Sequence, residues 1–374
     1  PSLFFRRMPS CVQLRTQMIK FGLLSLLLLL APPVRSQELN PIGHEFLVNQ
    51  QTSGSQTRPH VAGSSNGEFV VTWIDGNSFK ARRFDANGQA LSDEILISSS
   101  GASGTSNLYA YAWSAGRFAL ISVSNNGTNL HLLQADNTLG AAVTLGIGSE
   151  FDVDIRGDHL VAAYTSNGHI RMRVWDLSTG TWMGPYMQAS EAPNNDYRLP
   201  RVRWTGTGSI VALYAGGSGP HPRHVFRKPF SAALLALAPE APVLTLNNGT
   251  IGVINASINT NDELLFYMRY GLNGTDVFTG RILDADGGII SASVGAMSAP
   301  YAYYYSGCLL YDDGSVVLSN NYRTSLNDPL DYCVRVQCGI NHGSPHTGFQ
   351  IATTTSQTPV SGMKIFQPNR MIWS

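Results

Sequence analysis

A short apolar run that returns seven times is the feature that most constrains how this chain can fold. Each run is four to six residues long and opens on a polar residue: Glu68–Trp73, Arg117–Ser122, His159–Tyr164, Ser209–Tyr214, Glu263–Met268, Ser315–Leu318 and Arg370–Trp373. The steps between successive openings are 49, 42, 50, 54, 52 and 55 residues. A near-constant step of this size is typical of a repeat architecture.

The runs are predicted to be β-strands, because they are too short for helices and rich in β-branched and aromatic residues. They are apolar on both faces, so each must be covered on both sides. A more alternating segment follows each run, as in Phe79–Phe84 or Ile170–Trp175, and then a turn and a short further strand. Four strands in about fifty residues is the content of a propeller blade. The sequence therefore predicts an all-β fold, a seven-bladed β-propeller.

The two ends of the repeat array predict how the ring closes. Glu45–Asn49 has the character of a fourth strand but precedes the first complete unit, so we expect it to serve the last blade. The seventh run ends one residue before Ser374, so the last blade is expected to be incomplete in this sequence.

The N-terminal residues predict export. The chain opens on Pro1, and Met18 is the better initiator, so residues 1–17 are expected to be upstream non-coding or fragment residues. Residues 18–36 have the character of a signal peptide, with Lys20 before an apolar run and Val34–Ser36 as a cleavage site. The alternative is a membrane anchor, but the run is about half the length that crosses a bilayer. Residues 37–374 are expected to form a single propeller domain.

The net charge and the glycosylation sequons predict the partner and the environment of the mature chain. Residues 1–36 carry five basic residues and no acid, so the mature chain keeps 20 basic and 25 acidic groups. The mature chain is weakly acidic and has no block of basic residues. We therefore expect neither a nucleic-acid partner nor insertion of the mature chain into a membrane. The expected partner is an extracellular protein or glycan. Four sequons make glycosylation candidates of Asn126, Asn248, Asn255 and Asn273.

Three cysteines remain after cleavage, and their pairing stays open. Cys333 and Cys338 lie five residues apart in a predicted strand, about 16 Å when extended, which is too far for a disulfide without a turn. A long-range bridge from Cys308 is an equal alternative, and the odd count leaves one thiol free or paired to another chain.

The candidate chemical sites are few, and no catalytic or cofactor motif is present. Asp284–Gly287 and Asp312–Gly314 offer carboxylates to calcium, but tight turns need the same residues, so no cofactor is expected. The histidine pairs at residues 221–224 and 342–346 look like loops rather than metal sites. A possible ligand platform for sugar rings is formed by Tyr301, Tyr303 and Tyr305, which alternate along one strand. Four arginines are candidates for a central anion site, although nothing in the sequence brings them together: Arg58, Arg82, Arg201 and Arg281.

Residues 43–98 resemble a repeat of large exported and surface proteins, many of them bacterial. The shared pattern is Glu-Phe-x-Val-Asn, Gln-x-x-Pro-x-Val-Ala, Gly-x-Phe-Val-Val-Thr-Trp and Phe-Asp-Ala-x-Gly, matched here by Glu45–Asn49, Gln56–Ala62, Gly67–Trp73 and Phe84–Gly88. The resemblance implies a propeller-like, cell-surface or adhesive protein and transfers no catalytic residue.

These observations predict a secreted or cell-surface protein that is not an enzyme. Its expected role is adhesion, protein or glycan binding, or extracellular assembly. The alternative is a carbohydrate-active hydrolase, sialidase-like or another glycosidase propeller, because propellers gather side chains around one central funnel.

Overall fold

The computed structural model describes most of the repeat array. The described residues are 46–51, 53–99, 106–124, 127–146, 150–191, 196–217, 221–272, 275–299, 301–323, 331–337, 349–353, 364–366 and 370–372. Residues 46–374 form one compact unit. In the part of the chain that is described, no helix has the length and apolar character needed to span a bilayer.

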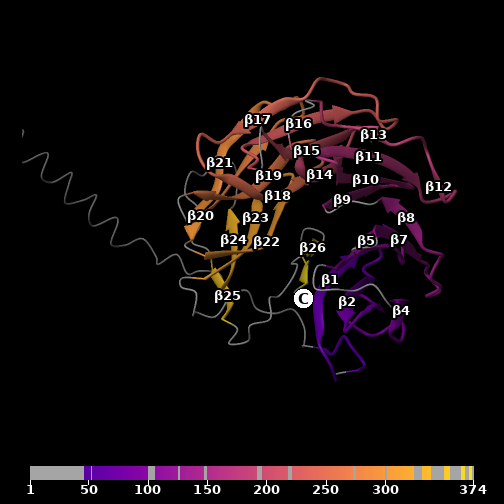
Figure 1. Cartoon of the computed structure of the whole chain (residues 1–374). Coiled ribbons are helices and arrows are strands. Elements are labelled where there is room, and N and C mark those ends of the chain that lie inside the picture. Colours follow the sequence, from indigo (N-terminus) through magenta and orange to yellow (C-terminus); the bar gives the residue numbers. More distant parts are fainter. Residues whose placement is uncertain are drawn as a thin grey trace, which may run out of the picture. The chain divides into compact units, whose positions relative to one another are not determined.

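The strands form successive antiparallel sheets in chain order (Figure 1). Sheet 1 contains β1 (Gln56–Gly63), β2 (Phe69–Asp75), β3 (Ser78–Phe84) and β4 (Ile95–Ser98). Sheet 2 contains β5 (Asn107–Ser114), β6 (Arg117–Ser124), β7 (Gly127–Leu133) and β8 (Val143–Gly146). Sheet 3 contains β9 (Phe151–Arg156), β10 (His159–Ser166), β11 (His169–Asp176), β12 (Thr181–Trp182) and β13 (Met187–Gln188), the last two pairing with different parts of β11.

The remaining sheets repeat the same order. Sheet 4 contains β14 (Arg198–Trp204), β15 (Ile210–Gly216), β16 (His224–Phe230) and β17 (Ala241–Thr245). Sheet 5 contains β18 (Thr250–Ile258), β19 (Leu264–Leu272), β20 (Thr275–Leu283) and β21 (Ile289–Ala299). Sheet 6 contains β22 (Tyr301–Leu310), β23 (Val316–Arg323), β24 (Asp331–Gln337) and β25 (Phe349–Thr353). A two-stranded sheet follows, with β26 (Lys364–Phe366) and β27 (Arg370–Ile372).

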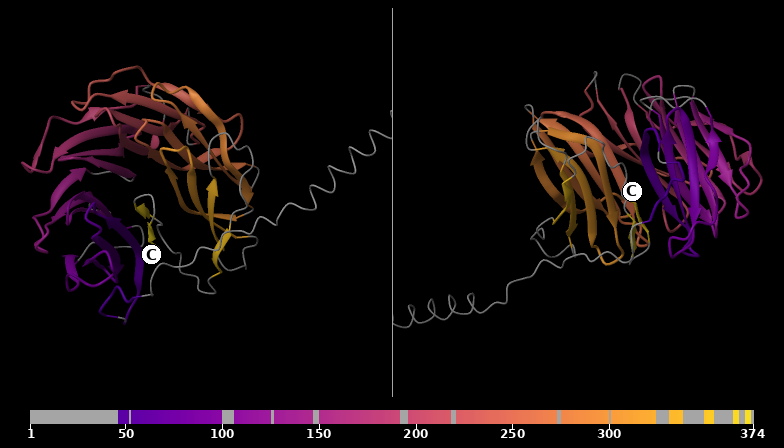
Figure 2. Two further views of the ribbon diagram at one scale, coloured as in Figure 1. Left: turned by 180° about the vertical axis from the view of Figure 1, so that it is seen from behind. Right: turned by 90° about the horizontal axis from the view of Figure 1, so that it is seen from below.

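This arrangement is a β-propeller, as the sequence predicts. Every apolar run forms the second strand of its sheet, and the described part of the seventh unit holds two strands. The first strand of each sheet contacts the first strand of the next, and β26 contacts β1. Figure 2 shows the sheets turned edge-on around a common centre.

The hydrophobic core lies between neighbouring sheets. One cluster joins Val70 and Ile74 of β2 to Leu108 and Phe118 of sheet 2, and comparable clusters join the later pairs of sheets. All residues of β15, the second strand of sheet 4, are buried. The second strands are therefore apolar on both faces because each is covered by the sheet before it and the sheet after it.

Repeated turns close the third strands. Asp85 Oδ1 accepts the N–H groups of Asn87 and Gln89, both at 2.8 Å, and Gly88 has φ 83°. Asp284 repeats the turn with Gly287 at φ 96°. Aspartate supplies the acceptor and glycine tolerates the left-handed conformation, which explains the Asp-x-x-Gly pattern.

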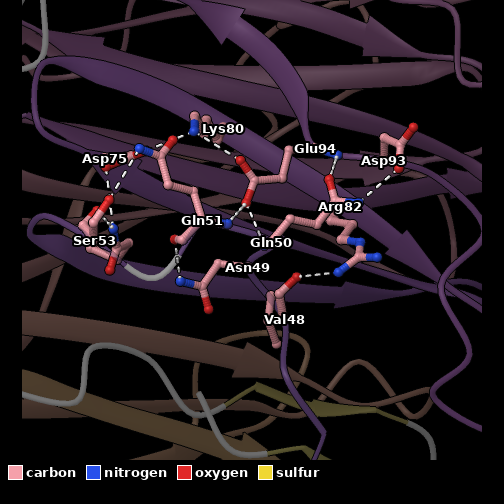
Figure 3. A network of polar contacts seen from close by, with 11 residues as sticks. Val48, Asn49, Gln50, Gln51, Ser53, Asp75, Lys80, Arg82, Asp93 and Glu94 are labelled. Carbon is pink, nitrogen blue, oxygen red and sulfur yellow. Dashed lines mark hydrogen bonds and ion pairs between the residues drawn. The ribbon is translucent and has the colours of Figure 1, made fainter.

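Residues 46–49 form no ladder, yet they occupy the place of an outer strand. Arg82 Nη1 donates to Val48 O at 2.9 Å (Figure 3). In sheet 5, the equivalent Arg281 donates in the same way to Val243 O of β17, the outer strand of the preceding sheet, at 2.6 Å. Phe46 also packs on Phe84, with ring centroids 5.2 Å apart. The segment therefore fills the outer-strand position of the unit that precedes sheet 1 around the ring.

A polar network fixes the following residues to sheet 1. Glu94 accepts the backbone N–H groups of Gln50 and Gln51 at 2.6 and 3.1 Å, and its other oxygen pairs with Lys80 Nζ at 2.8 Å (Figure 3). Lys80 also pairs with Asp75 at 2.7 Å. The N-terminal segment is thus held by side chains of sheet 1 rather than by a strand partner.

Candidate functional site

The first strands of the sheets line the centre of the propeller. Each pairs with its second strand along one edge, and among the described strands no sheet places a strand on the other edge. An open strand edge leaves backbone N–H and C=O groups that need other partners. The candidate site is built around the side chains that meet this need.

Strand register identifies equivalent positions on the six first strands. The upper belt is defined by the residues that pair with the position four residues after the polar residue that opens each apolar run, namely His60, Tyr109, Asp152, Arg201, Asn255 and Gly307. The lower belt lies two residues later in each strand and comprises Ala62, Tyr111, Asp154, Arg203, Ser257 and Leu309. Residues i and i+2 of a strand lie on one face, so the two belts share a side.

Belt side chains accept hydrogen bonds from the backbone of the next first strand. His60 Nδ1 accepts from Ala110 N–H at 3.1 Å, Asp152 Oδ2 from Val202 N–H at 2.9 Å, Asp154 Oδ2 from Trp204 N–H at 2.7 Å and Ser257 Oγ from Leu310 N–H at 3.1 Å. The same link recurs four times, from three sheets and with three kinds of acceptor. The belts therefore act as a cross-sheet ladder that satisfies the open edges.

Charge concentrates where sheets 3, 4 and 5 meet. Arg203 Nη1 lies 2.6 Å from Asp152 Oδ2, and Arg203 Nε donates to Ala256 O at 2.9 Å. The two side chains are 21% and 12% exposed, so water screens this pair only weakly. The pair ties three consecutive sheets together.

The charged cluster shifts the pKa values of its members. Burial raises the pKa of Asp154, and the opposing effect of Arg203 does not cancel it. Burial would lower the pKa of Arg203, but the carboxylates of Asp152 and Asp154 outweigh burial and raise it. Burial also raises the pKa of Tyr111 well above its ordinary value, with Asp152 adding to the effect. Arg203 therefore stays protonated, and Asp154 holds its proton to a higher pH than a free aspartate.

Arg201 differs from the other charged belt residues. Its Nη1 donates to Pro200 O at 2.6 Å, and it forms no ion pair with any described residue. The side chain is half-buried on the upper belt. It is a cation without a carboxylate partner in the described part of the chain.

An open hollow lies at the turn end of the first strands of sheets 3 to 6. Its volume is about 420 Å³, and its lining includes Asp154, Arg156, Trp204, Asn259, Tyr311 and Asp312. Several of these groups already bond to neighbouring turns: Asp312 Oδ1 accepts from Thr260 N–H at 2.8 Å, and Asn259 Nδ2 donates to Tyr311 O at 3.2 Å. The hollow adjoins the lower belt through Asp154.

The structure places the tyrosine platform on a first strand. Tyr301, Tyr303 and Tyr305 lie on β22, before and within a register irregularity between Ala302 and Ser306. Their side chains lie outside the described residues. Their role as a ligand platform stays a prediction.

The four sequons fall in different environments. Asn248 is exposed in the turn before β18, whereas Asn255 is half-buried on the upper belt. Asn126 and Asn273 lie outside the described residues. Access for modification therefore favours Asn248 over Asn255 among the described pair.

Asp284, Asp313 and His224 have partners in their own turns and strands, whereas residues 342–346 lie outside the described residues. Asp284 and Asp313 accept backbone N–H groups of their own turns, from Gly288 at 2.7 Å and Ser315 at 2.8 Å. His224 Nδ1 lies 3.0 Å from Thr245 Oγ1. Within the described ranges, no group of three or more His, Cys, Asp or Glu side chains has the arrangement of a metal site.

Cys308 is a free thiol, and burial raises its pKa to about 12. Cys333 lies on β24 with its side chain outside the described residues, and Cys338 lies outside them entirely. The alternative of a long-range bridge from Cys308 is therefore not formed in this structure.

The four candidate arginines separate into two pairs. Arg58 and Arg201 lie on first strands, whereas Arg82 and Arg281 lie on third strands and donate to outer-strand carbonyls. They do not form one central cluster.

Sequence reasoning missed the belts, although a signal for them exists. The upper belt residue stands eight positions before the polar residue that opens the apolar run in five sheets and seven positions before it in sheet 3. Counting back from the apolar runs would have aligned His60, Tyr109, Asp152, Arg201 and Asn255.

Comparison with known proteins gives information about the fold of this chain and not about its function. No protein-family model and no curated protein matches the chain. A crystal structure of a protein of unknown function from Dyadobacter fermentans is similar, with 11% identity, a TM-score of 0.52, and coverage of 78% of this chain and 96% of that chain. An α-L-arabinanase from Penicillium chrysogenum, in complex with arabinobiose, has 15% identity, a TM-score of 0.48 and coverage of 77% and 94%. The Dos1 propeller has 11% identity, a TM-score of 0.48 and coverage of 84% and 75%. At these identities, none of them brings a function to this chain.

Proposed function

We propose that this chain is an exported β-propeller that binds a glycan or protein ligand outside the cell without turning it over. The observation that carries the proposal is the engagement of both belt carboxylates. Asp152 and Asp154 each accept a backbone N–H from β14, and Asp152 also pairs with Arg203 at 2.6 Å. A carboxylate tied in this way acts as a link between sheets and is poorly placed to exchange protons or attack a substrate.

Export is supported by the sequence at the N-terminus and by an accessible sequon. Residues 18–36 have the pattern of a cleaved signal peptide, and Asn248 stands in an exposed turn. Expression in a eukaryotic secretory host tests this part. The expected result is a chain in the medium that begins at Gln37, and retention of residues 18–36 in a membrane fraction would contradict it.

The binding role is tested on the secreted chain with a glycan array, a pull-down from extracellular protein and an assay for sugar release. The proposal expects at least one bound ligand and no turnover. Steady release of sugar from any glycoside, lost in Asp154→Asn, would contradict it.

A carbohydrate-active hydrolase is the second candidate, favoured by one specific observation. The two aspartates stand two residues apart on β9, so they share one face of the strand, and a glycosidase requires two such carboxylates at one site. Burial also raises the pKa of Asp154, as a general acid requires. This candidate requires Asp152 to leave Arg203 when substrate binds, and turnover that depends on both aspartates would establish it.

A further inference from the structure

We propose that Arg201 is the binding residue for an acidic sugar, one that carries a carboxylate such as a uronate or a sialic acid. The inference rests on the proposed binding function and names the class of ligand. It starts from an imbalance of charge in the upper belt.

The other charged residues of the belts, and His60, each have a cross-strand partner. Asp152 and Arg203 pair with each other, Asp154 accepts Trp204 N–H, and His60 accepts Ala110 N–H. Arg201 instead donates one hydrogen bond to the carbonyl of its own neighbour, Pro200. A guanidinium has five N–H donors, so most of its capacity is open to a ligand.

The surroundings of Arg201 suit a sugar. The next upper-belt residue is Asn255, on the adjacent strand β18, and the one after it is Gly307, which has no side chain. An amide on the strand next to a half-buried cation is a group that can orient sugar hydroxyls.

The guanidinium chemistry selects an anion with two oxygens. A planar guanidinium binds a carboxylate through two parallel hydrogen bonds, and a half-buried site strengthens the attraction relative to water. A neutral sugar would leave the charge of Arg201 unmatched. An acidic peptide would supply the same carboxylate, so the sugar class has to be tested against it.

The experiment measures binding of the secreted chain to oligogalacturonate, hyaluronan oligosaccharides and sialyllactose, each beside its carboxyl methyl ester, with polyglutamate as the peptide probe. We expect at least one acidic sugar to bind, its ester to bind at least tenfold more weakly, and polyglutamate to bind more weakly than the sugar. Raising the salt concentration should weaken the interaction.

Variants distinguish a loss of binding caused by removing the Arg201 guanidinium from a general loss of folded structure. Arg201→Gln should weaken acidic-sugar binding at least tenfold and remove its salt dependence. Arg201→Lys should have an affinity between that of the parent chain and that of Arg201→Gln. Arg117→Gln is the matched control, because Arg117 stacks on Trp113 with 4.2 Å to the ring centroid in a hairpin outside the belts. Unfolding curves of all variants should overlay the parent, since Arg201 makes one local bond.

The outcomes distinguish this inference from the function on which it rests. Equal binding of ester and acid, tighter binding of polyglutamate, or unchanged binding by Arg201→Gln would overturn the inference and leave a binding propeller in place. Absence of any glycan or protein ligand for the parent chain would overturn both.

Discussion

Two regions of the belts, one charged and one neutral, perform the same structural task with different chemistry. On the side formed by β9 and β14, the belts carry Asp152, Asp154, Arg201 and Arg203. On the side formed by β18 and β22, the same register positions carry Asn255, Ser257, Gly307 and Leu309. Strand edges are linked on both sides, by an ion pair and carboxylates on one and by a hydroxyl on the other. The scaffold therefore meets the same requirement with different belt side chains on its two sides.

The largest loss of unfolding free energy is expected from breaking the ion pair between Asp152 and Arg203 on the charged side. Arg203→Met leaves Asp152 partly buried without its cation, and removing one partner of such a pair costs about 3 kcal/mol of unfolding free energy. Denaturant unfolding measures the loss. Arg117→Met is the control, with a loss expected below about 1 kcal/mol. A loss for Arg203→Met no larger than the control's would mean that the charged side is not held by this pair.

The neutral side adjoins the last unit, whose outer position is filled by the N-terminal segment. Phe46 is 45% exposed and packs on Phe84, so Phe46→Ala should cost about 1 to 2 kcal/mol. Leu47 is 64% exposed, so Leu47→Ala should change little. Equal effects of the two substitutions in denaturant unfolding would show that the segment does not dock as described.

A smaller effect is expected from removing the hydroxyl link on the neutral side. Ser257 Oγ accepts from Leu310 N–H at 3.1 Å, and losing one neutral hydrogen bond costs about 1 kcal/mol. Ser257→Ala should therefore cost about a third of what Arg203→Met costs. If the serine change proves the more harmful of the two, the contrast between the sides is wrong.

The smallest effect is a pH dependence confined to the charged side. The pKa of Asp154 is raised above its ordinary value of 3.8, so the folded chain binds this proton more tightly than the unfolded chain. Its contribution to stability is present below about pH 3.8 and is lost as pH rises through the raised pKa. The stability of the parent minus that of Asp154→Asn should fall over this window and then level off. A difference that grows with pH would contradict the assignment.

The sequence predicts the scaffold better than the site, and the residues show why. The run from Phe69 to Trp73 is apolar on both faces, and only coverage from two sides satisfies it, so the pattern itself demands stacked sheets. Turns such as Asp85–Gly88 can also be predicted, because their backbone conformation requires aspartate and glycine at these positions. Belt residues such as His60 and Arg201 lie half-buried on the first strands, where neither a hydrophobic period nor turn geometry restricts the side chain. Their partners are backbone groups of the next sheet, which become visible only when the strands are in register.

The role of Asp152 and Arg203 as a structural link is tested most directly by a double-mutant cycle. Unfolding free energies are measured for the parent chain, Asp152→Asn, Arg203→Met and the double variant. The engaged pair predicts a coupling free energy of about 2 kcal/mol or more, because both side chains are largely shielded from water and 2.6 Å apart. Additive losses, with a coupling near zero, would contradict the link and return Asp152 to the list of groups free for chemistry.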